Sequence, residues 1–296
     1  MFRRAALASG YTDTQLKRAV QAGDLVRLWN GAYLNKDGVE RTPKQVHKLT
    51  TIAAVSTGDG DHVVSHESAA LFHGLSILHP RLNHIHFATG RATGGGIDHQ
   101  RHLHSGKLDD SDIVVVDGIR VTSIDRTAAD LACTSDFAVA LAVLDSALRH
   151  NADPDAISEL LGRRKRGATQ GRRALAHADG KSENAGESWG RAQMICDGLP
   201  VPRLQHEFYS DSGIVVARTD YDWDGKLVGE FDGLRKYEKD LREGETAADA
   251  VIREKRREDD LRRMDVMVIR WLWENLRQQS VVPMVREWLG RVGIAA

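Results

Sequence analysis

The sequence has few cysteines, no long apolar run and almost no net charge, and each of these features excludes a class of proteins. The two cysteines, Cys133 and Cys196, lie far apart, each within an apolar helical pattern. This arrangement argues against a disulfide framework and predicts buried free thiols in a reducing compartment. No apolar run approaches the roughly 20 residues that cross a membrane, and no signal peptide is visible. We therefore expect a cytoplasmic protein with no membrane partner.

The charge balance is nearly even, with 41 basic and 42 acidic side chains and a formal net charge of −1. A dedicated DNA-binding protein is usually basic, so any contact with nucleic acid must come from local basic patches. The 296 residues leave room for two or three domains, and 41% hydrophobic with 28% charged residues is typical of a globular protein. The sequence contains no internal repeat and no low-complexity segment.

The most informative stretch runs from Val215 to Lys236 and reads VVARTDYDWDGKLVGEFDGLRK. Its alternation predicts two strands that carry Asp220, Glu230 and Asp232, followed by a lysine. Glu230 and Asp232 are two residues apart, so on a strand their side chains point to the same face. Carboxylates on rigid strands beside a basic residue are typical of a Mg²⁺ site that hydrolyses phosphodiesters through an activated water. The alternative is an acidic, exposed face of an antiparallel sheet.

Whether Asp220 joins the other acids depends on the loop between these two strands. A three-residue loop from Trp223 to Gly225 would place Asp220 opposite Val228, diagonal to Glu230 and on its face. A two-residue Asp-Gly turn would instead send Asp220 to the opposite face of the sheet. The metal-site interpretation therefore requires the longer loop or a bulge.

The segments around this hairpin predict a compact α/β layer. Upstream, Asn184-x-x-Glu187 is typical of a helix start, and apolar residues follow it at helical spacing. Further segments predict a strand, a charged helix, a buried strand and an amphipathic helix, at Arg203 to Ser210, Ala247 to Met264, Val266 to Trp273 and Val281 to Val292. The order of helix, three strands, helix, strand and helix indicates a sheet flanked by helices.

Four runs of this region resemble a known family. They are GES (186–188), RTD (218–220), GEFDG (229–233) and EKRREDDLRRMDVMVIRW (254–271). In order and spacing they are similar to very-short-patch-repair-like PD-(D/E)XK domains, which have a restriction-endonuclease-like fold. The resemblance implies a Mg²⁺ ion surrounded by Glu187, Asp220, Glu230 and Asp232. It implies a catalytic set of Asp220, Glu230, Asp232 and Lys236, and a phosphate contact by Lys236 and Arg257.

The sequence departs from this family's pattern at the lysine. The usual motif has an acid, any residue and then lysine, but Asp232 stands in that place and Lys236 follows four residues later. Glu187 also fits as the far half of a capping box with Asn184. Arg257 lies in a run of mixed charge, which is typical of a solvated helix face. Both interpretations of Glu187 and of Arg257 stay open at this point.

The N-terminal part has a different pattern. Thr12 predicts the start of a short helix that ends at Gly23, and Leu25 to Leu34 alternates around Asn30-Gly31, a strong hairpin signal. The run YTDTQLKRAVQAGDLVRLWNGAYL (11–34) resembles the winged-helix domain of AbiEi-type antitoxins, in which it binds promoter DNA. The resemblance implies double-stranded DNA and a cognate toxin as partners. It implies DNA contacts by Arg3, Arg4, Lys17, Arg18, Arg27 and Asn30. The alternative is that these are ordinary surface residues.

The middle region, about Thr42 to Asp179, predicts a mixture of helices and short strands. Expected helices are Thr42 to Ser56, His66 to His73, Asp125 to Ala132 and Phe137 to Arg149, and expected strands are His84 to Ala88 and Asp112 to Thr122. This region resembles the middle portion of the same antitoxin-like proteins. The run GRRKRGATQGRR (162–173) is basic and broken by glycine, which favours a solvated linker over a loop that contacts phosphate.

Several histidines are close together in the sequence, at positions 84, 86, 99, 102 and 104. No paired cysteines and no HExxH spacing accompany them, and strand alternation accounts for His84 and His86. The sequence analysis therefore predicts no zinc site among them.

Taken together, these patterns predict an α/β, or α+β, multidomain protein. We expect a winged-helix domain at residues 1–41, a middle α+β domain at 42–179 and a restriction-endonuclease-like α/β domain at 180–296. One functional hypothesis is a DNA-binding protein that acts as a Mg²⁺-dependent DNA endonuclease. The other is an AbiEi-like antitoxin and transcriptional repressor whose nuclease-like fold is catalytically inactive. The displaced lysine favours the repressor, and the retained acids favour the enzyme.

Overall fold

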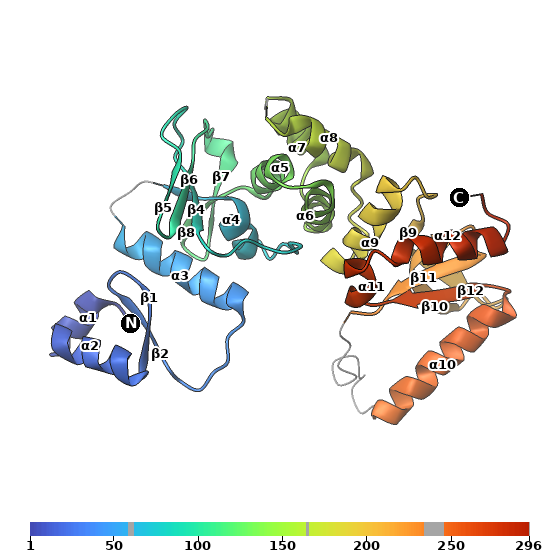
Figure 1. The fold of residues 1–296 in the computed structure, drawn as a ribbon, viewed down its shortest axis with the longest axis horizontal. Coiled ribbons are helices and arrows are strands. Elements are labelled where there is room, and N and C mark those ends of the chain that lie inside the picture. The colour runs from blue at the N-terminus through green and yellow to red at the C-terminus, as the bar shows by residue number, and fades with distance from the viewer. Residues whose placement is uncertain (59–61, 164–165, 234–245, 296) are drawn as a thin grey trace. The chain divides into compact units, whose positions relative to one another are not determined.

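The computed structural model describes residues 1–58, 62–163, 166–233 and 246–295 (Figure 1). The chain divides into two compact units, the first comprising Met1–Leu131 with Asp155–Leu160 and the second Ala132–Pro154 with Leu161–Ala296. Helices occur in both units, together with three β-sheets in the described residues. This confirms the expected α+β class, whereas the domain boundaries expected at residues 41 and 179 stay predictions. No helix in the described residues is long and apolar enough to cross a membrane.

The N-terminal segment is two short helices followed by a hairpin. These are α1 (Arg3–Ala8), α2 (Asp13–Ala22), β1 (Leu25–Trp29) and β2 (Ala32–Asn35). Thr12 begins α2 with a capping box to Gln15, and Gly23 ends it with a left-handed φ of 80°. Ala6, Leu16 and Leu25 are buried together and join the helices to the hairpin. The predicted helix and hairpin are confirmed.

The rest of the first unit is built on a mixed sheet of six strands in the order β5-β6-β4-β3-β8-β7. The strands are β3 (Val63–Val64), β4 (Ile85–Ala88), β5 (Gly96–Asp98), β6 (Arg101–His104), β7 (Ile113–Val116) and β8 (Ile119–Thr122). The helices are α3 (Pro43–Thr57), α4 (His66–Phe72) and α5 (Ile124–Thr134), with the 3₁₀ turn η1 (Asp110–Asp112). Apolar side chains of the sheet pack with those of α3 and α4. The sequence predicts these three α-helices and the strands β4, β7 and β8, but not β3, β5 and β6.

Helices connect this sheet to the C-terminal part of the chain. They are α6 (Phe137–Arg149), α7 (Pro154–Gly162) and α8 (Ala168–His177). The linker expected at 162–173 is therefore wrong for the residues from Ala168 onward, and residues 164–165 lie outside the described part. The glycines that suggested a linker instead permit close packing. A Cβ on Gly171 would lie 2.7 Å from Leu161 Cδ2, and one on Gly167, whose φ is 74°, would overlap the carbonyl of Cys133.

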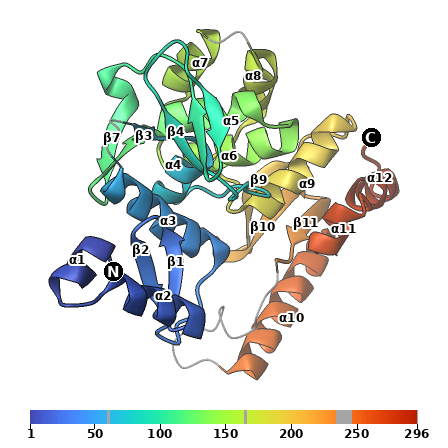
Figure 2. The same ribbon diagram turned by 60° about the vertical axis from the view of Figure 1, so that its left-hand side comes forward.

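The C-terminal part is a four-stranded sheet in the order β12-β11-β10-β9, with helices on both faces (Figures 1 and 2). Its elements are α9 (Ala185–Cys196), β9 (Arg203–Tyr209), β10 (Val215–Trp223), β11 (Leu227–Phe231), α10 (Ala247–Arg263), β12 (Met267–Trp271), α11 (Trp273–Arg277) and α12 (Val281–Arg291). The first three strands are antiparallel, and β12 runs parallel to β11. This is the predicted order of elements, with the short α11 added.

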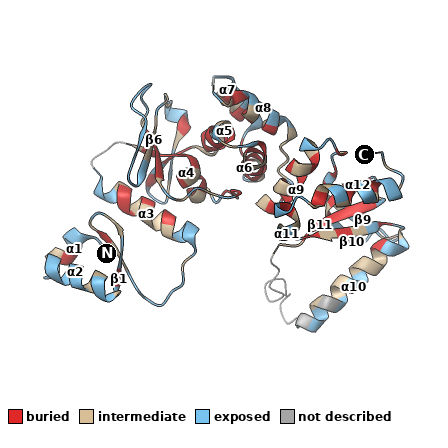
Figure 3. Ribbon diagram, in the orientation of Figure 1, coloured by how far each residue is buried: buried red, intermediate tan, exposed pale blue. Residues whose placement is uncertain are grey.

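Two apolar clusters lie on the two faces of this sheet. Tyr221, Leu227 and Trp271 pack with side chains of α9, α11 and α12 on one face. Val228 packs with Leu261 of α10 on the other. Colouring by burial shows the outward sides of the helices exposed (Figure 3), and among the strands β11 is buried throughout while β9, β10 and β12 contain buried and exposed residues. The two cysteines form no disulfide, as predicted, but neither is buried as expected, because Cys133 is half-buried and Cys196 at the end of α9 is exposed.

The hairpin that carries the acids has a strand register two residues away from the predicted one, because its loop lies one residue further along the chain. Trp223 pairs with Leu227, so the three-residue loop is Asp224 to Lys226 and not Trp223 to Gly225. Asp224 and Gly225 have φ values of 54° and 67°. The expected loop would have removed Trp223, which is 3% exposed, from the strand and from the core. Burial of this large side chain therefore decides the register.

Candidate functional site

The first candidate site lies at the start of α9 and begins with its N-terminal cap. The side chain of Asn184 accepts hydrogen bonds from the backbone N–H groups of Gly186 and Glu187, at 2.9 and 3.0 Å. Glu187 is only 4% exposed, and its carboxylate accepts a hydrogen bond from the backbone N–H of Glu183 at 2.7 Å and another from the Asn184 amide. Glu187 thus contacts the start of α9 through the backbone of Glu183 and the side chain of Asn184, rather than through the backbone N–H of Asn184 as a capping box would.

Helix α9 is itself held by a buried ion pair with α6. Arg191 Nη2 donates to Asp145 Oδ1 at 2.5 Å, and the side chains are 3% and 1% exposed. The other oxygen of Asp145 accepts a hydrogen bond from the hydroxyl of Ser188 at 2.7 Å. The other terminal nitrogen of Arg191 donates to the carbonyl of His177 at 2.5 Å, so this buried ion pair orients α9 against α6. This contact fixes the helix end that carries Glu187.

Asp220 joins Glu187 through one amide group. Gln205 Nε2 lies 3.2 Å from Asp220 Oδ1 and 3.4 Å from Glu187 Oε2. The other oxygen of Asp220 accepts a hydrogen bond from the backbone N–H of Phe231 at 2.8 Å. Gln205 has a φ of 50°, which a non-glycine residue rarely adopts. Two of the four predicted metal ligands therefore lie on either side of a single side-chain donor.

The electrostatics of this pair favour protonation. Burial, and after it the negative charge of Asp220, raises the pKa of Glu187 to about 8. Burial is also the main reason that the pKa of Asp220 is raised to about 6, although its hydrogen bond from Phe231 opposes the shift. Two carboxylates that share a poorly solvated site cannot both ionise cheaply without a cation or a proton between them.

Glu230 has a different environment from Asp220. Tyr221 pairs with Gly229, so the next residues along the two strands, Asp220 and Glu230, lie opposite each other. Glu230 Oε1 lies 2.5 Å from Arg257 Nη1, and its Oε2 accepts from Arg270 Nε at 2.8 Å. The same Arg270 pairs with two further carboxylates, Glu254 and Glu258, each at 2.9 Å. Two guanidinium groups thus hold both oxygens of Glu230.

The remaining predicted residues of this site are less well gathered. The backbone N–H of Asp232 donates to the carbonyl of Trp271 at 2.9 Å, just beyond the end of β11. Lys236 lies outside the described residues. Arg257, the predicted phosphate contact, is engaged with Glu230 and with Glu254. In the described part of the chain, these acids do not form a group of three whose ligand atoms all lie within 4.8 Å.

These positions partly fit a Mg²⁺ ion. Glu187 and Asp220 are close enough to share one donor, and magnesium in proteins usually takes one or two carboxylates, with water and substrate as its other ligands. Glu230 could join them only after it separates from its two arginines. The site therefore has two carboxylates available rather than four.

The second candidate site is the exposed surface of the N-terminal helices and hairpin. Arg4, Lys17 and Arg18 are exposed to solvent. Arg3 is also exposed and pairs with Asp13 at 2.5 Å, and Arg27 donates a hydrogen bond to Asn30 at the hairpin turn. These six predicted DNA contacts thus lie on one small subdomain, with two of the arginines already engaged by neighbours.

Comparison with known proteins adds to this geometry. Residues 62–177 match the AbiEi antitoxin C-terminal domain, so the chain contains an antitoxin-type domain, whose residues belong in part to each of the two compact units. The chain is 31% identical over 233 residues to an uncharacterised protein of Mycobacterium tuberculosis, named Rv2248 in strain H37Rv and MT2308 in strain CDC 1551. That alignment covers 75% of this chain and 79% of the relative. The chain belongs to the same family as this mycobacterial protein.

A solved structure shows a weaker likeness. The crystal structure of the Rv2827c protein from Mycobacterium tuberculosis is 13% identical to this chain, with a TM-score of 0.40. The match covers 67% of this chain and 76% of that one. The family match at 62–177 confirms the resemblance of the middle region to AbiEi-type antitoxins and supports a toxin–antitoxin-like role, whereas the resemblance of residues 11–34 stays a prediction. The nuclease-like part of the resemblance stays a prediction.

One group of side chains was missed by the sequence analysis. His86, which strand alternation explained, and His104 lie beside His66 at the start of α4. His66 precedes the other histidines by about twenty positions in the sequence, and no metal-binding motif joins them. The available signal was the pair of His-x-His patterns at 84–86 and 102–104, which place histidines on one face of each of two strands.

Proposed function

We propose that this protein is an AbiEi-like antitoxin that regulates transcription by binding double-stranded DNA through residues 1–41. The observation that carries the proposal is the match of residues 62–177 to the AbiEi antitoxin C-terminal domain, immediately after a helix–helix–hairpin subdomain. A cognate toxin is the proposed protein partner. The relation to an uncharacterised mycobacterial protein supports the family assignment and says nothing of DNA.

Local charge supports the DNA-binding part of this proposal. Residues 1–41 contain seven basic and four acidic side chains, a net charge of +3, whereas the whole chain has a net charge of −1. Lys17 and Arg18 lie side by side on α2, and Arg27 and Asn30 lie at the hairpin. A helix and an adjacent hairpin are the two elements with which winged-helix proteins contact a duplex, mostly through phosphates.

The test is binding of the full chain to duplex DNA from upstream of its own gene, measured by fluorescence anisotropy. Lys17→Gln with Arg18→Gln should weaken binding at least about tenfold, because two phosphate contacts are lost. The matched control is Arg277→Gln with Arg291→Gln, which removes two exposed arginines from the C-terminal part. Equal binding by both double variants, or no binding by the wild type, would overturn the DNA-binding proposal.

One observation favours a second function, Mg²⁺-dependent hydrolysis of DNA. Glu187 and Asp220 share the amide of Gln205, so two carboxylates lie close together in a poorly solvated site, where a cation would stabilise their ionised forms. We propose that these two residues would hold the ion, with Glu230 and Asp232 as further ligands. A bound Mg²⁺ would supply an activated water and neutralise charge on the phosphate. The pairing of Glu230 with Arg257 and Arg270 makes the regulator the better-supported function.

Cleavage of supercoiled plasmid and single-stranded DNA, in Mg²⁺ or Mn²⁺, separates the two functions. If the protein is an enzyme, Asp220→Asn should abolish metal-dependent cleavage while leaving anisotropy binding unchanged. Asp224→Asn, in the neighbouring hairpin loop, serves as the control and should cleave as the wild type does. DNA binding without cleavage by any of the three proteins would rule out the hydrolytic function and leave the regulator.

A further inference from the structure

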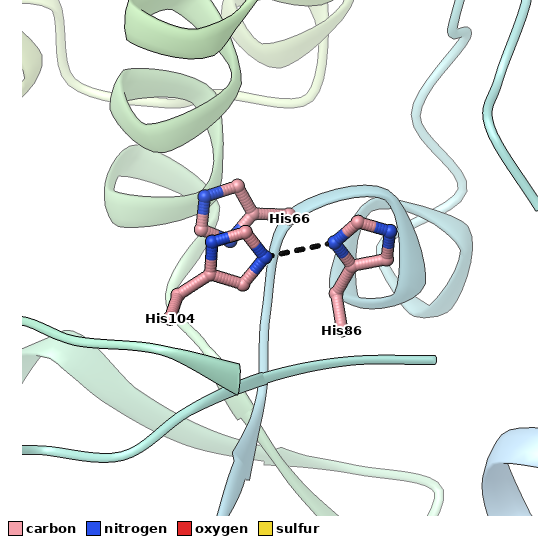
Figure 4. A group of neighbouring side chains, drawn as sticks. All are labelled: His66, His86 and His104. Atoms are coloured by element: carbon pink, nitrogen blue, oxygen red, sulfur yellow. Dashed lines mark hydrogen bonds between the residues drawn. The ribbon is translucent and has the colours of Figure 1, made fainter. Parts of the chain in front are cut away.

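Three histidines come together in the first unit, within the antitoxin-type domain. His66 begins α4, His86 lies in β4 and His104 ends β6, and one ligand nitrogen from each lies within 4.8 Å of the other two. Figure 4 shows the rings facing one another, with a hydrogen bond of 2.9 Å between His86 Nδ1 and His104 Nε2. The rings of His66 and His104 are stacked, with centroids 3.6 Å apart.

The sheet produces this cluster by register and alternation. Strands β4 and β6 are parallel neighbours in which His86 pairs with His102 and Ala88 with His104. Positions 102 and 104 lie on one face of β6, because successive side chains of a strand alternate. The other face of these strands is apolar, since Phe87 and Leu103 pack in the core there. The fold thus holds the imidazoles of β4 and β6 on one face of the sheet, and His66 at the start of α4 lies against the same face.

The cluster is buried to an unusual degree for polar side chains. His66 and His86 are 5% and 7% exposed. His104 is partly buried. Neutral imidazole is the form that binds metal ions. Several buried imidazoles that contact one another are costly unless something shares their lone pairs.

Groups outside the cluster orient its rings in the way that groups around metal-bound histidines do. His86 Nε2 lies 3.5 Å from Glu67 Oε2, so its Nδ1 is the nitrogen that faces the cluster. His66 Nδ1 lies 3.1 Å from the hydroxyl of Ser65, and the backbone N–H of His86 donates to Ser68 at 3.0 Å. A carboxylate behind a metal-binding histidine is the commonest such support.

The backbone supports the same interpretation. His66 has a φ of 49°, in the left-handed region that non-glycine residues seldom adopt. Such strain persists where the surrounding structure over-determines a conformation, most often at functional sites. Here it directs the side chain of the first residue of α4 toward the two strands. The conformation is independent evidence that the ring position matters.

We propose that His66, His86 and His104 form a binding site for a divalent transition-metal ion, with Zn²⁺ as the best match. Imidazole nitrogen suits zinc, copper or nickel, whereas magnesium and calcium prefer oxygen. A tetrahedral zinc ion with Zn–N bonds of about 2.0–2.1 Å holds its nitrogens about 3.3 Å apart. The nitrogens here, from 2.9 Å to within 4.8 Å, need only small ring rotations, which would also unstack His66 from His104.

The three histidines leave a fourth coordination position. His102 is the nearest further imidazole, with its ring centroid 3.9 Å from that of His104 and 5.2 Å from that of His86. A fourth histidine would make the site closed and structural, because closed zinc sites have four protein ligands. The proposed ion would then join α4, β4 and β6 and stabilise the antitoxin-type domain.

The test uses the full chain after treatment with a chelator, followed by titration with Zn²⁺ against a chromophoric competitor. We expect one ion per chain, and a rise in the melting temperature with Zn²⁺. Addition of Co²⁺ should produce the visible absorption of a tetrahedral nitrogen site. His104→Gln should lose at least about 100-fold in affinity and the melting shift, because it removes a ligand. His99→Gln is the control, since that side chain is 96% exposed and outside the cluster.

A second variant guards against misfolding. Glu67→Gln removes only the carboxylate behind His86 and should weaken Zn²⁺ binding by about 10–100-fold while the circular dichroism spectrum stays unchanged. Absence of Zn²⁺ binding by the wild type would overturn the proposal. So would Zn²⁺ binding that His104→Gln and Glu67→Gln leave intact, because the ion would then bind elsewhere. None of these results depends on whether residues 1–41 bind DNA.

Discussion

At the scale of single residues, the same kind of side chain has different properties in different places. The pKa values of Glu187 and Asp220 are raised, mainly by burial, whereas Glu230 is held by Arg257 and Arg270. Their order in the sequence does not distinguish them, because all are acids in strongly patterned segments. The groups that surround each carboxylate in the fold therefore determine its electrostatic environment.

The raised pKa values predict a dependence of stability on pH. The pKa of Glu187 rises from an ordinary value of 4.5 to about 8, and that of Asp220 from 3.8 to about 6. The folded chain therefore binds more protons than the unfolded chain, and the free energy of unfolding falls as pH rises from about 4 to about 8. Each group contributes at most about 1.4 kcal/mol per pH unit.

Chemical denaturation between pH 5 and pH 8 measures this slope. Glu187→Gln should flatten it, because the variant cannot ionise at that position. Glu287→Gln is the control, since Glu287 is 59% exposed in a surface pair with Arg291. An identical pH dependence in wild type and Glu187→Gln would show that Glu187 is ionised in the folded chain.

At the scale of elements, glycine has two distinct uses in the C-terminal part. Gly186 lies in the first turn of α9, and a Cβ built on it would overlap the ring of Phe231. Phe231 in turn donates the backbone hydrogen bond that Asp220 accepts. Gly290, near the end of α12, has no atom within 4 Å of such a Cβ. Gly186 permits a close contact. Gly290 serves no such contact and increases the conformational entropy that the backbone loses when the helix forms.

The two glycines predict substitutions of opposite sign. Gly186→Ala should lower the free energy of unfolding by about 1–3 kcal/mol, because the ring of Phe231 must move. Gly290→Ala should raise it by about 0.5–1 kcal/mol through helix propensity. Urea denaturation of both variants beside the wild type gives the two signs. Stabilisation by Gly186→Ala would contradict the close contact between α9 and β11.

At the scale of the whole molecule, charge is uneven along the chain. The formal net charge is −1, but residues 1–41 have a net charge of +3. Binding of DNA by this protein would therefore depend on a small part of its surface. Each phosphate that the protein neutralises releases counter-ions from the DNA. The slope of binding affinity against salt concentration therefore reports how many phosphates are contacted.

Within residues 1–41, five basic residues are predicted to contact DNA, namely Arg3, Arg4, Lys17, Arg18 and Arg27. The logarithm of the association constant should fall with the logarithm of salt concentration with a slope no steeper than about −4.5, or about −0.9 for each contact. Anisotropy titrations from low to moderate salt measure this slope. A steeper slope would show that basic residues outside residues 1–41 also contact the phosphates.

The sequence by itself determined most of the elements of this protein. Capping residues and glycines located α2, apolar periodicity located α6 and α12, and alternation located β9 to β12. These signals are local, because each depends on neighbours within one or two turns. The antitoxin-type region was also recognisable from the sequence and is confirmed by the match at 62–177.

The tertiary structure decided the register of the hairpin and the composition of the sites. Burial of Trp223 moved the loop by one residue, and packing against Leu161 made Gly171 part of a helix rather than of a linker. The parallel pairing of β4 with β6 brought His86 and His104 beside His66. Such contacts join residues that are distant in the sequence, so their geometry depends on packing and strand pairing that no local pattern contains.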